Sequence, residues 1–460
     1  MREIPRSVER EYRTLDLGDA RRVERAKRVA ASFLQAPEAS IPRACYGPGE
    51  AKGAYRFLSS AEVAPQALRA AGAAATVERI TGRRRVLAVQ DKTNLDYTGL
   101  PATEGLGPLD TPQCRGLKVQ TVLMLEESGV PLGVMDQQVW ARDEELGKRD
   151  TRRERSAQEK ESWYWRRGFE AVQERVPPGV EVIGIADRES DIYFVLGMPR
   201  REWMHLLVRS AHDRGVESEE HRHLREAVTA APVLGTYDLQ VERTHRRQAR
   251  RARLEVRAAR VVLQPPRRGK NGEGLGPVAV SAVQVRERGE VPQGEKRLEW
   301  DLLATWPVET LEAARECARL YAQRWKVERL HYVLKSGCRI EELQLETADR
   351  LERALALYTF VAWRLLWLTY RAREAPASPC TEALEDDEWR VLLAMSGDRL
   401  VRGPPTLRDA VRRIAGFGGF QGRKGDGDPG VKALWHGWRR LMDFVLAAKA
   451  LSAHRDVGNG

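Results

Sequence analysis

The chain has 460 residues, 77 of them Lys or Arg against 66 Asp or Glu, for a net charge of +11. This length predicts two or three domains, and a hydrophobic content of 42% excludes a disordered chain. The positive charge favours a polyanionic partner, most simply nucleic acid, although an ordinary basic soluble protein would share it. The five cysteines show no C-x-x-C spacing and no zinc-like pairing with histidine, so we expect neither disulfides nor structural zinc, and a reducing cytoplasm fits.

The first sixty-odd residues predict basic helices. Cationic and apolar positions alternate at helical spacing in LGDARRVERAKRVAASFLQ, and GEAKGAYRFLSS predicts a second, shorter helix. A charged helix is often only a solvated surface. The density of Arg and Lys nevertheless favours contact with phosphates.

A series of apolar segments then predicts β-strands, with a turn at EESG and a charged helix over residues 156–176. The predicted strands are 86–89, 116–125, 130–142, 180–187 and 203–210. The order is three strands as a meander, helix, strand, helix and strand. That is the order of a ribonuclease-H-like domain, an inference about fold that does not by itself give function.

The rest of the chain predicts a β-rich insertion followed by helices. Short β-like segments separated by Gly and Pro occupy residues 235–306 and include the cationic tract THRRQARRAR. A helix follows, with Thr310 as its N-cap and Gly337 at its end. Residues 354–370 are the most apolar stretch, but Arg364 interrupts it and it is slightly short for a membrane span, so we expect a buried helix and no membrane partner.

Three carboxylates from separate segments predict a metal site. Asp91 and Asp187 each follow an apolar strand, and ligands bind at that edge of open α/β sheets. Two carboxylates held close together repel and raise one pKa unless a cation lies between them. Glu328 would complete an all-oxygen site for Mg²⁺ or Mn²⁺, and two such ions about 4 Å apart suit phosphodiester cleavage. Either aspartate alone is equally well explained as a turn residue; the three together favour the metal site.

Glu328 belongs to a narrow polar stripe on its predicted helix. Tyr321, Arg324, Glu328 and Lys335 fall within roughly 60° of one another around the axis. Arg324 and Lys335 are suited to hold phosphates on either side of the metals, and Tyr321 to donate a hydrogen bond to another phosphate. The stripe therefore predicts a row of phosphate-binding side chains that also includes one metal ligand, Glu328.

The spacing Y-x2-R-x3-E-x6-K resembles the YREK signature of the DDE transposases of the bacterial insertion-sequence-four family, in particular its Tn-five-like branch. The similarity extends over nearly the whole chain, in LGDARR, GAYRF, VQDKTNLDY, EKES, ADRESDIY, VRS, EWDLLATWPVET and LERALALYTFVAWRLLWL. The basic insertion and residues 418–430 depart from the family pattern, and no role is carried over to them.

This resemblance implies a metal-dependent enzyme of cut-and-paste transposition. Asp91, Asp187 and Glu328 would be the catalytic, metal-binding triad for two Mg²⁺ ions, with Mn²⁺ as a substitute. A homodimer would bind double-stranded DNA at terminal inverted repeats, cut it through a hairpin intermediate and join the ends to target DNA. Besides the stripe, the implied DNA contacts are Arg25, Arg56, Arg188, Arg209 and Trp300. Trp300 would stack on a flipped base, although a core aromatic of an edge strand would explain it too.

The expected architecture is an α/β, ribonuclease-H-like core between two helical regions. We expect an N-terminal DNA-binding domain over residues 1–68, the catalytic domain over 69–372, and a dimerisation region over 381–460, in a bacterial cytoplasmic protein associated with the nucleoid. A non-catalytic DNA-binding protein derived from a transposase stays an alternative, as does a ribonuclease-H-like nuclease without strand transfer. The intact carboxylates argue against the first, and the flanking helical regions argue against the second.

Overall fold

The computed structural model describes residues 3–143, 161–241, 248–266, 274–397 and 403–458. Its N-terminal part is helical, as the spacing of cationic and apolar residues predicts. The helices there are α1 (Arg6–Glu11), α2 (Ala20–Gln35), α3 (Ile41–Ala44), α4 (Pro48–Ser59) and α5 (Pro65–Ile80). Asp19 caps α2 by accepting the N–H of Arg21, and the apolar side of this helix packs inward, where Phe33 stacks on Tyr358 with ring centroids 4.3 Å apart.

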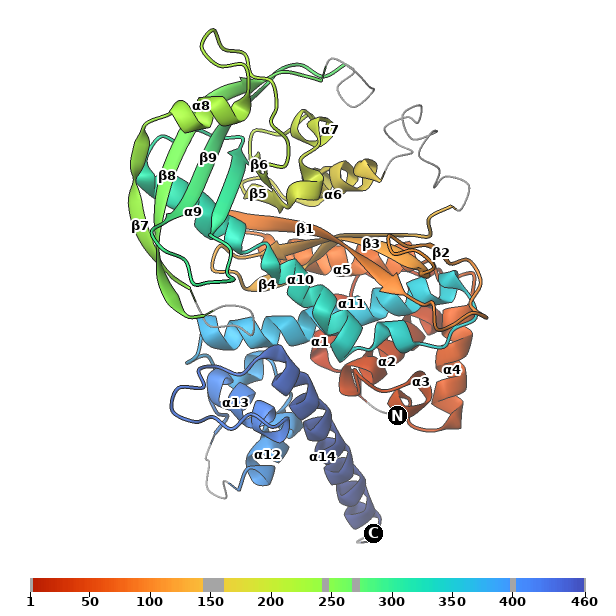
Figure 1. Ribbon diagram of the computed structural model, residues 1–460. Helices are drawn as coiled ribbons and strands as arrows, with labels where there is room; N and C mark the ends of the chain where they lie inside the picture. Colours follow the sequence, from red (N-terminus) through yellow and green to blue (C-terminus); the bar gives the residue numbers. More distant parts are fainter. Residues whose placement is uncertain (1–2, 144–160, 242–247, 267–273, 398–402, 459–460) are drawn as a thin grey trace.

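One large mixed sheet lies at the centre of the molecule (Figure 1). Its strands are β1 (Arg85–Asp96), β2 (Gly107–Pro108), β3 (Arg115–Leu125), β4 (Pro131–Trp140), β5 (Glu181–Ala186), β6 (Met204–Arg209), β7 (Val233–Val241), β8 (Arg250–Leu263), β9 (Val278–Arg288) and β10 (Glu299–Ala304). Along the path β4-β3-β1-β5-β6, the first three strands pair antiparallel and the last three pair parallel. This is the ribonuclease-H-like order, so the predicted fold class is confirmed.

The predicted β-rich insertion continues this same sheet. Strand β10 pairs antiparallel with β6, and β9, β8 and β7 follow outward. The first strand of the insertion begins at Val233, close to the predicted start at residue 235, and α8 (Leu224–Ala230) packs on β8 and β9. The cationic tract THRRQARRAR, residues 244–253, lies partly outside the described residues.

Helices cover both faces of the core sheet (Figure 1). On one face, α6 (Ser162–Arg175) packs Phe169 into a cluster with Val86 and Ala88 of β1, next to α7 (Tyr193–Leu196). On the other face, Leu87 and Val89 pack in the cluster that includes α9 (Leu311–Ala322), α10 (Trp325–Tyr332) and α11 (Ala348–Glu374). Successive residues of β1 thus point to opposite faces, which decides where the polar residues after Val89 point.

Helix α11 is the buried helix predicted from the apolar stretch at residues 354–370. Seventeen of its 27 residues are buried, and its N-cap Thr347 accepts the N–H of Arg350. Arg364 donates to the carbonyl of Ala383 instead of facing lipid. Among the residues that the structure describes, we find no helix with the length and apolar character that crossing a membrane would require.

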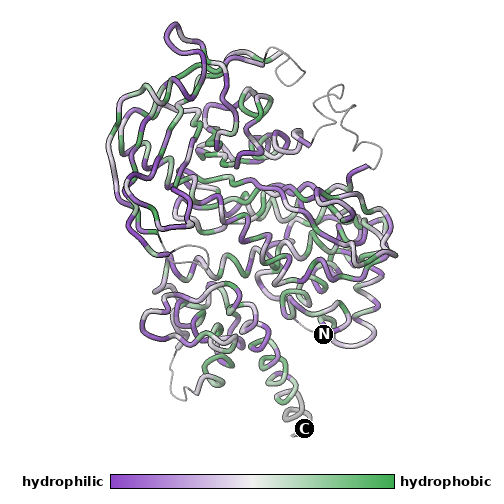
Figure 2. Tube along the Cα trace, in the orientation of Figure 1, coloured by the Kyte–Doolittle hydropathy of each residue, from purple (hydrophilic) through white to green (hydrophobic). Residues whose placement is uncertain are grey.

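The C-terminal region consists of α12 (Asp386–Met395), α13 (Leu407–Phe417) and α14 (Val431–Gly458). Hydrophilic and hydrophobic residues alternate along α13 and α14, as expected of helices that bury one side (Figure 2). The first half of α14 packs against the chain itself, where the indole N–H of Trp438 donates to the carbonyl of Leu34 at 2.9 Å. The end of α14 extends away from the rest of the molecule (Figure 1).

Candidate active site

Asp91 and Asp187 lie at one edge of the core sheet, on neighbouring parallel strands. The last parallel pair of β1 and β5 is Val89 with Ile185, and each aspartate follows two residues later. Asp187 comes directly after β5 and caps a short helical turn, η4 (Arg188–Ser190), by accepting the N–H of Glu189 at 2.9 Å. Because these two strands run parallel and in register, both aspartates come just beyond their last shared pair and so reach the same place.

The prediction that Asp91 lies beyond the end of its strand is wrong. Strand β1 continues to Asp96, and Asp91 lies within it, opposite Thr121 of β3. Pairing with β3 keeps β1 extended after β5 has ended, so that polar residues belong to the strand itself. Asp91 follows Leu87 and Val89 at a period of two, which directs it to the face covered by α10.

Arg324 holds two of the three predicted carboxylates. One guanidinium nitrogen, Nη1, lies 3.2 Å from Oδ2 of Asp91, and the other, Nη2, lies 2.6 Å from Oε1 of Glu328. Arg324 is itself buried, with 7% of its surface exposed. The sequence predicts that this arginine faces phosphates along the helix; in the free protein it instead bridges a strand carboxylate and a helix carboxylate.

The charges of this centre are coupled. Burial raises the pKa of Asp91 to about 7; Arg324 opposes the rise, while Asp187 and Glu328 add to it. Burial also raises the pKa of Asp187, against the lowering effects of the Glu189 N–H and of Arg324. The carboxylates of Asp187 and Glu328 therefore lie close enough to repel that of Asp91, and one guanidinium partly compensates this charge. Additional positive charge would be favourable at this position.

The described part of the chain holds no group of three Asp, Glu, His or Cys side chains arranged closely enough to bind a metal ion as it stands. At the candidate triad, the guanidinium of Arg324 occupies the space between Asp91 and Glu328. The donor set still fits a hard divalent ion, since all three donors are carboxylate oxygens and the centre lacks compensating charge. Asp91, Asp187 and Glu328 would hold such an ion once Arg324 turned away.

The polar stripe does not lie on one regular helix. Helix α9 ends at Ala322, α10 starts at Trp325, and a π-helical turn, η5 (Val333–Gly337), follows, in which the N–H of Cys338 bonds to the carbonyl of Val333. A π turn contains an extra residue and so rotates the positions after it around the helix axis. The predicted N-cap at Thr310 is present, with the N–H of Ala313 as its donor.

Consequently, the other two stripe residues lie in different surroundings. Tyr321 is buried beside the centre, and its pKa is raised by burial against the influence of Arg324 and Arg209. Lys335, on the π turn, forms an ion pair with Glu341 at 3.1 Å instead of joining the carboxylates. The structure brings Tyr321, Arg324 and Glu328 together and gives Lys335 a separate partner.

The remaining predicted DNA contacts form two groups. Near the sheet edge, Arg188 is exposed directly after Asp187, Arg209 ends β6 and donates to the carbonyl of Glu299 at 3.0 Å, and Trp300 is half-buried in β10. Away from this edge, Arg25 on α2 pairs with Glu50 at 3.1 Å, and Arg56 on α4 is exposed. These last two belong to the N-terminal helices and not to the carboxylate centre.

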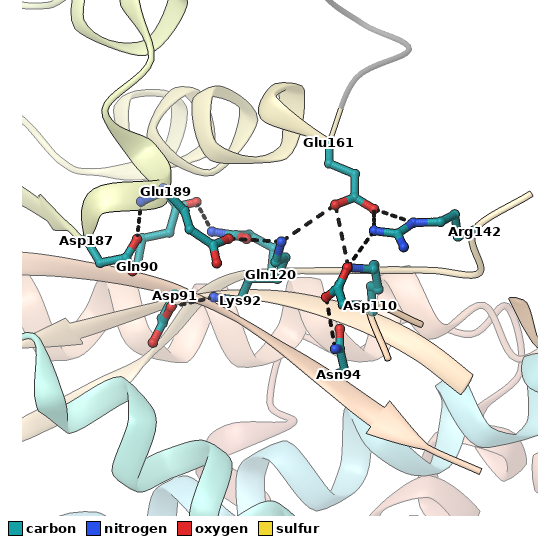
Figure 3. Close-up of polar contacts among 11 residues, drawn as sticks. Gln90, Asp91, Lys92, Asn94, Asp110, Gln120, Arg142, Glu161, Asp187 and Glu189 are labelled. Atoms are coloured by element: carbon teal, nitrogen blue, oxygen red, sulfur yellow. Dashed lines mark hydrogen bonds and ion pairs between the residues drawn. The ribbon is translucent and has the colours of Figure 1, made fainter. Parts of the chain in front are cut away.

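Sequence reasoning missed a charged network on the opposite face of β1 (Figure 3). Lys92 pairs with Glu189 at 2.9 Å and with Glu161 at 3.6 Å. Lys118, fully buried in β3, pairs with Asp110 at 2.8 Å and also approaches Glu161. The network ties the turn that carries Asp187 to β1 and to the residue before α6. The signal in the sequence was Lys118 itself, because a lysine within the apolar run GLKVQTVLML needs an acidic partner.

Three parts of the chain match models of known protein families. Residues 6–63 match a model described as "Transposase DNA-binding", and residues 113–364, more than half of the chain, match "Transposase DDE domain". The chain belongs to the DDE transposase family. Residues 360–458 of this transposase match "Transposase Tn5 dimerisation domain", beginning within α11. The DDE match includes Asp187 and Glu328 and starts after Asp91, and DDE domains of this kind typically use divalent metal ions.

Among solved structures, the chain is similar to a piggyBac transposase in a synaptic complex with hairpin DNA. The identity is 9% and the TM-score is 0.31, over 65% of this chain and 50% of that protein. The transposase described here thus spans about half the length of that protein.

Proposed function

We propose that this protein catalyses cut-and-paste transposition as a member of the Tn-five-like branch of the insertion-sequence-four family. It binds the terminal inverted repeats of its element, cleaves the strands through a hairpin intermediate and joins the ends to target DNA. The observation that carries the proposal is the contact of Arg324 with both Asp91 and Glu328, close to Asp187 at the end of the neighbouring strand. The matches to DNA-binding, DDE and dimerisation models support it.

In this proposal, the three carboxylates hold two divalent ions, Mg²⁺ with Mn²⁺ as a substitute. Such ions, when bound, activate a water and stabilise the leaving oxygen of a phosphodiester. When DNA binds, Arg324 releases the carboxylates of Asp91 and Glu328 and binds a phosphate oxygen instead. Its planar guanidinium can donate parallel hydrogen bonds to either kind of group. The pair of Lys92 and Glu189 holds the turn of Asp187 in position from the other face of β1.

The decisive experiment uses DNA from either side of the gene, where inverted repeats would supply the substrate. The full chain is incubated with this DNA and Mg²⁺, and cut ends and joined products are separated on a gel. Joined products that disappear on chelation of the metal support a transposase. Cutting without joining would identify a nuclease, and binding without cutting would identify a non-catalytic DNA-binding protein.

The substitution Trp300→Ala tests the hairpin step. A hairpin leaves one base without room in the stack. Stacking of that base on an aromatic side chain offsets about 1–3 kcal/mol of the free-energy cost of unstacking it. We expect Trp300→Ala to slow hairpin formation much more than the first nick, and Phe or Tyr to retain part of the activity. A gel time course of nicked, hairpin and resolved ends measures this. Equal slowing of all steps would mean that Trp300 serves packing alone.

We further propose domain limits of 1–68 for DNA binding, 69–372 for catalysis and 381–460 for dimerisation, in a bacterial protein that works beside the nucleoid. Dimer contacts are assigned to the free end of α14. The first part of this helix is occupied within the chain, as the Trp438 contact shows, whereas Leu451 is 66% exposed. An exposed leucine on a helix that extends from the molecule is suited to a second copy of the chain.

The substitution Leu451→Glu should therefore weaken self-association without unfolding the protein. An exposed position tolerates substitution within about 0.5 kcal/mol of stability, but a carboxylate in an apolar interface opposes association. Light scattering over a concentration series measures the change, with Val233→Glu as a control at another exposed apolar residue, 43% exposed on β7. An unchanged dimer for Leu451→Glu would place the interface elsewhere.

A further inference from the structure

Lys118 is fully buried in β3, within the charged network on the face of β1 opposite to the carboxylate centre. Its ammonium lies 2.8 Å from Asp110 and 3.5 Å from Glu161, the residue before α6. A lysine is almost never fully buried unless it is paired, and a buried ion pair often stabilises a fold no more than apolar packing would. Stability alone therefore does not explain why this position carries a charge.

The ion pairs of this network link three cations to three carboxylates. The members are Lys92, Lys118, Arg142, Asp110, Glu161 and Glu189. Glu161 is the partner that all three cations share, at 3.6 Å from Lys92, 3.5 Å from Lys118 and 2.8 Å from Nε of Arg142. Loss of one cation would leave three carboxylates to share the other two.

Lys92 connects this network to the carboxylate centre. Its ammonium lies between Glu189, at 2.9 Å, and Glu161 (Figure 3). The backbone N–H of Glu189 in turn donates to the carboxylate of Asp187 at 2.9 Å. The pair of Lys92 with Glu189 therefore fixes the turn that orients the Asp187 carboxylate.

We propose that Lys118 is a positioning residue for Asp187: its ammonium neutralises Glu161, so that Lys92 stays paired with Glu189. The inference rests on the proposed function, in which Asp187 holds a divalent ion. Without the charge of Lys118, Lys92 is drawn from Glu189 toward Glu161. The turn after β5 then loses its attachment to β1, and the Asp187 carboxylate loses its fixed orientation. Loss of groups that orient a metal ligand weakens metal binding.

The variant Lys118→Met removes the charge and keeps a side chain of similar length. Asp110 and Glu161 are partly exposed and keep Arg142 as a partner, so we expect an unchanged or raised thermal midpoint. Calorimetric titration of the full chain with Mn²⁺ should show a dissociation constant raised about tenfold, the lower end of the about 10–100-fold loss for residues that orient a metal ligand. The Mg²⁺ concentration for half-maximal DNA cutting should rise equally, while DNA affinity stays unchanged.

A second substitution separates positioning from packing. The double variant Lys118→Met with Glu161→Gln leaves two cations for two carboxylates, so Lys92 is again free to pair with Glu189. This variant should recover most of the Mn²⁺ affinity, whereas a packing role for Lys118 would leave it no better than Lys118→Met. The variant Glu189→Gln breaks the same attachment at a residue whose side chain is 58% exposed, without changing the core, and should also weaken Mn²⁺ binding.

The control is Arg353→Met, which removes a buried guanidinium of α11 that donates to the carbonyls of Val63 and Leu58. It should lower the thermal midpoint and leave the Mn²⁺ affinity unchanged. Wild-type Mn²⁺ affinity in Lys118→Met or in Glu189→Gln would contradict the inference and leave the proposed function standing. An unmodified chain that binds Mn²⁺ but cuts no DNA would overturn the proposed function alone, because the titrations still decide the role of Lys118. Absence of both Mn²⁺ binding and cutting would overturn both.

Discussion

The substitution Asp187→Asn should reduce DNA strand cleavage by more than about a hundredfold while leaving DNA binding nearly normal. The amide preserves the shape of Asp187 but removes the charge that a divalent ion requires. Loss of a residue that merely supports a metal ligand already costs about 10–100-fold. DNA affinity should persist, because phosphate contacts from basic residues dominate it. Gel assays of cutting and of DNA binding measure the two effects separately.

The folded state should tolerate this change. Asp187 is partly buried, and burial raises its pKa, so removal of the charge relieves repulsion with Asp91. The ion pairs of Arg324 with Asp91 and Glu328 remain. Calorimetric titration with Mn²⁺ should show weakened metal binding in the variant. Asp238→Asn, at a surface carboxylate paired with Arg251, serves as the control. Substantial Mg²⁺-dependent cutting by Asp187→Asn would remove Asp187 from the metal site.

The substitution Gly437→Ala should destabilise the C-terminal region by at least about 1–3 kcal/mol. Helices α13 and α14 cross at this glycine, and a Cβ atom there would lie 1.6 Å from the carbonyl oxygen of Ile414. The same crossing leaves no room at Gly418, whose Cβ would lie 1.9 Å from the carbonyl oxygen of Ala433. Backbone atoms cannot rotate aside as a side chain does, so the two helices must separate.

A lower thermal midpoint and weaker self-association are the expected measurements for Gly437→Ala. The matched control is Gly416→Ala on α13, where a Cβ atom would have nothing within 4 Å. Alanine is favoured over glycine within a helix by about 0.5–1 kcal/mol, so the control should be neutral or stabilising. Equal stability of the two variants would show that the helices are not closely packed at Gly437.

Much of the fold could be predicted from local pattern. Apolar runs and the alternation of polar and apolar residues predicted the bounds of β3, β4, β5 and β6 to within a few residues. A strand that is buried on both faces needs a continuous apolar segment, which is visible in the sequence. The order of the elements predicted the ribonuclease-H-like fold, and in the structure the parallel pairing of β1 with β5 brings Asp91 and Asp187 together. The extent of β1 was not predicted, since its polar second half is extended through pairing with β3 and not through its own composition.

The residue types of the candidate site were set by the sequence alone: two aspartates near strand ends, and Tyr321, Arg324 and Glu328 at helical spacing. Only the tertiary structure decided how these groups meet. The contact of Arg324 with Asp91 joins residues 233 positions apart, and Lys118 is tolerated in the core because Asp110 folds back onto it. The periods of helices and strands are properties of the local backbone and can be seen in the sequence. The partner of a buried charge depends on which distant residues the complete packing places beside it. The sequence therefore determined which charges enter the site, and the packing determined that a guanidinium holds them in the free protein.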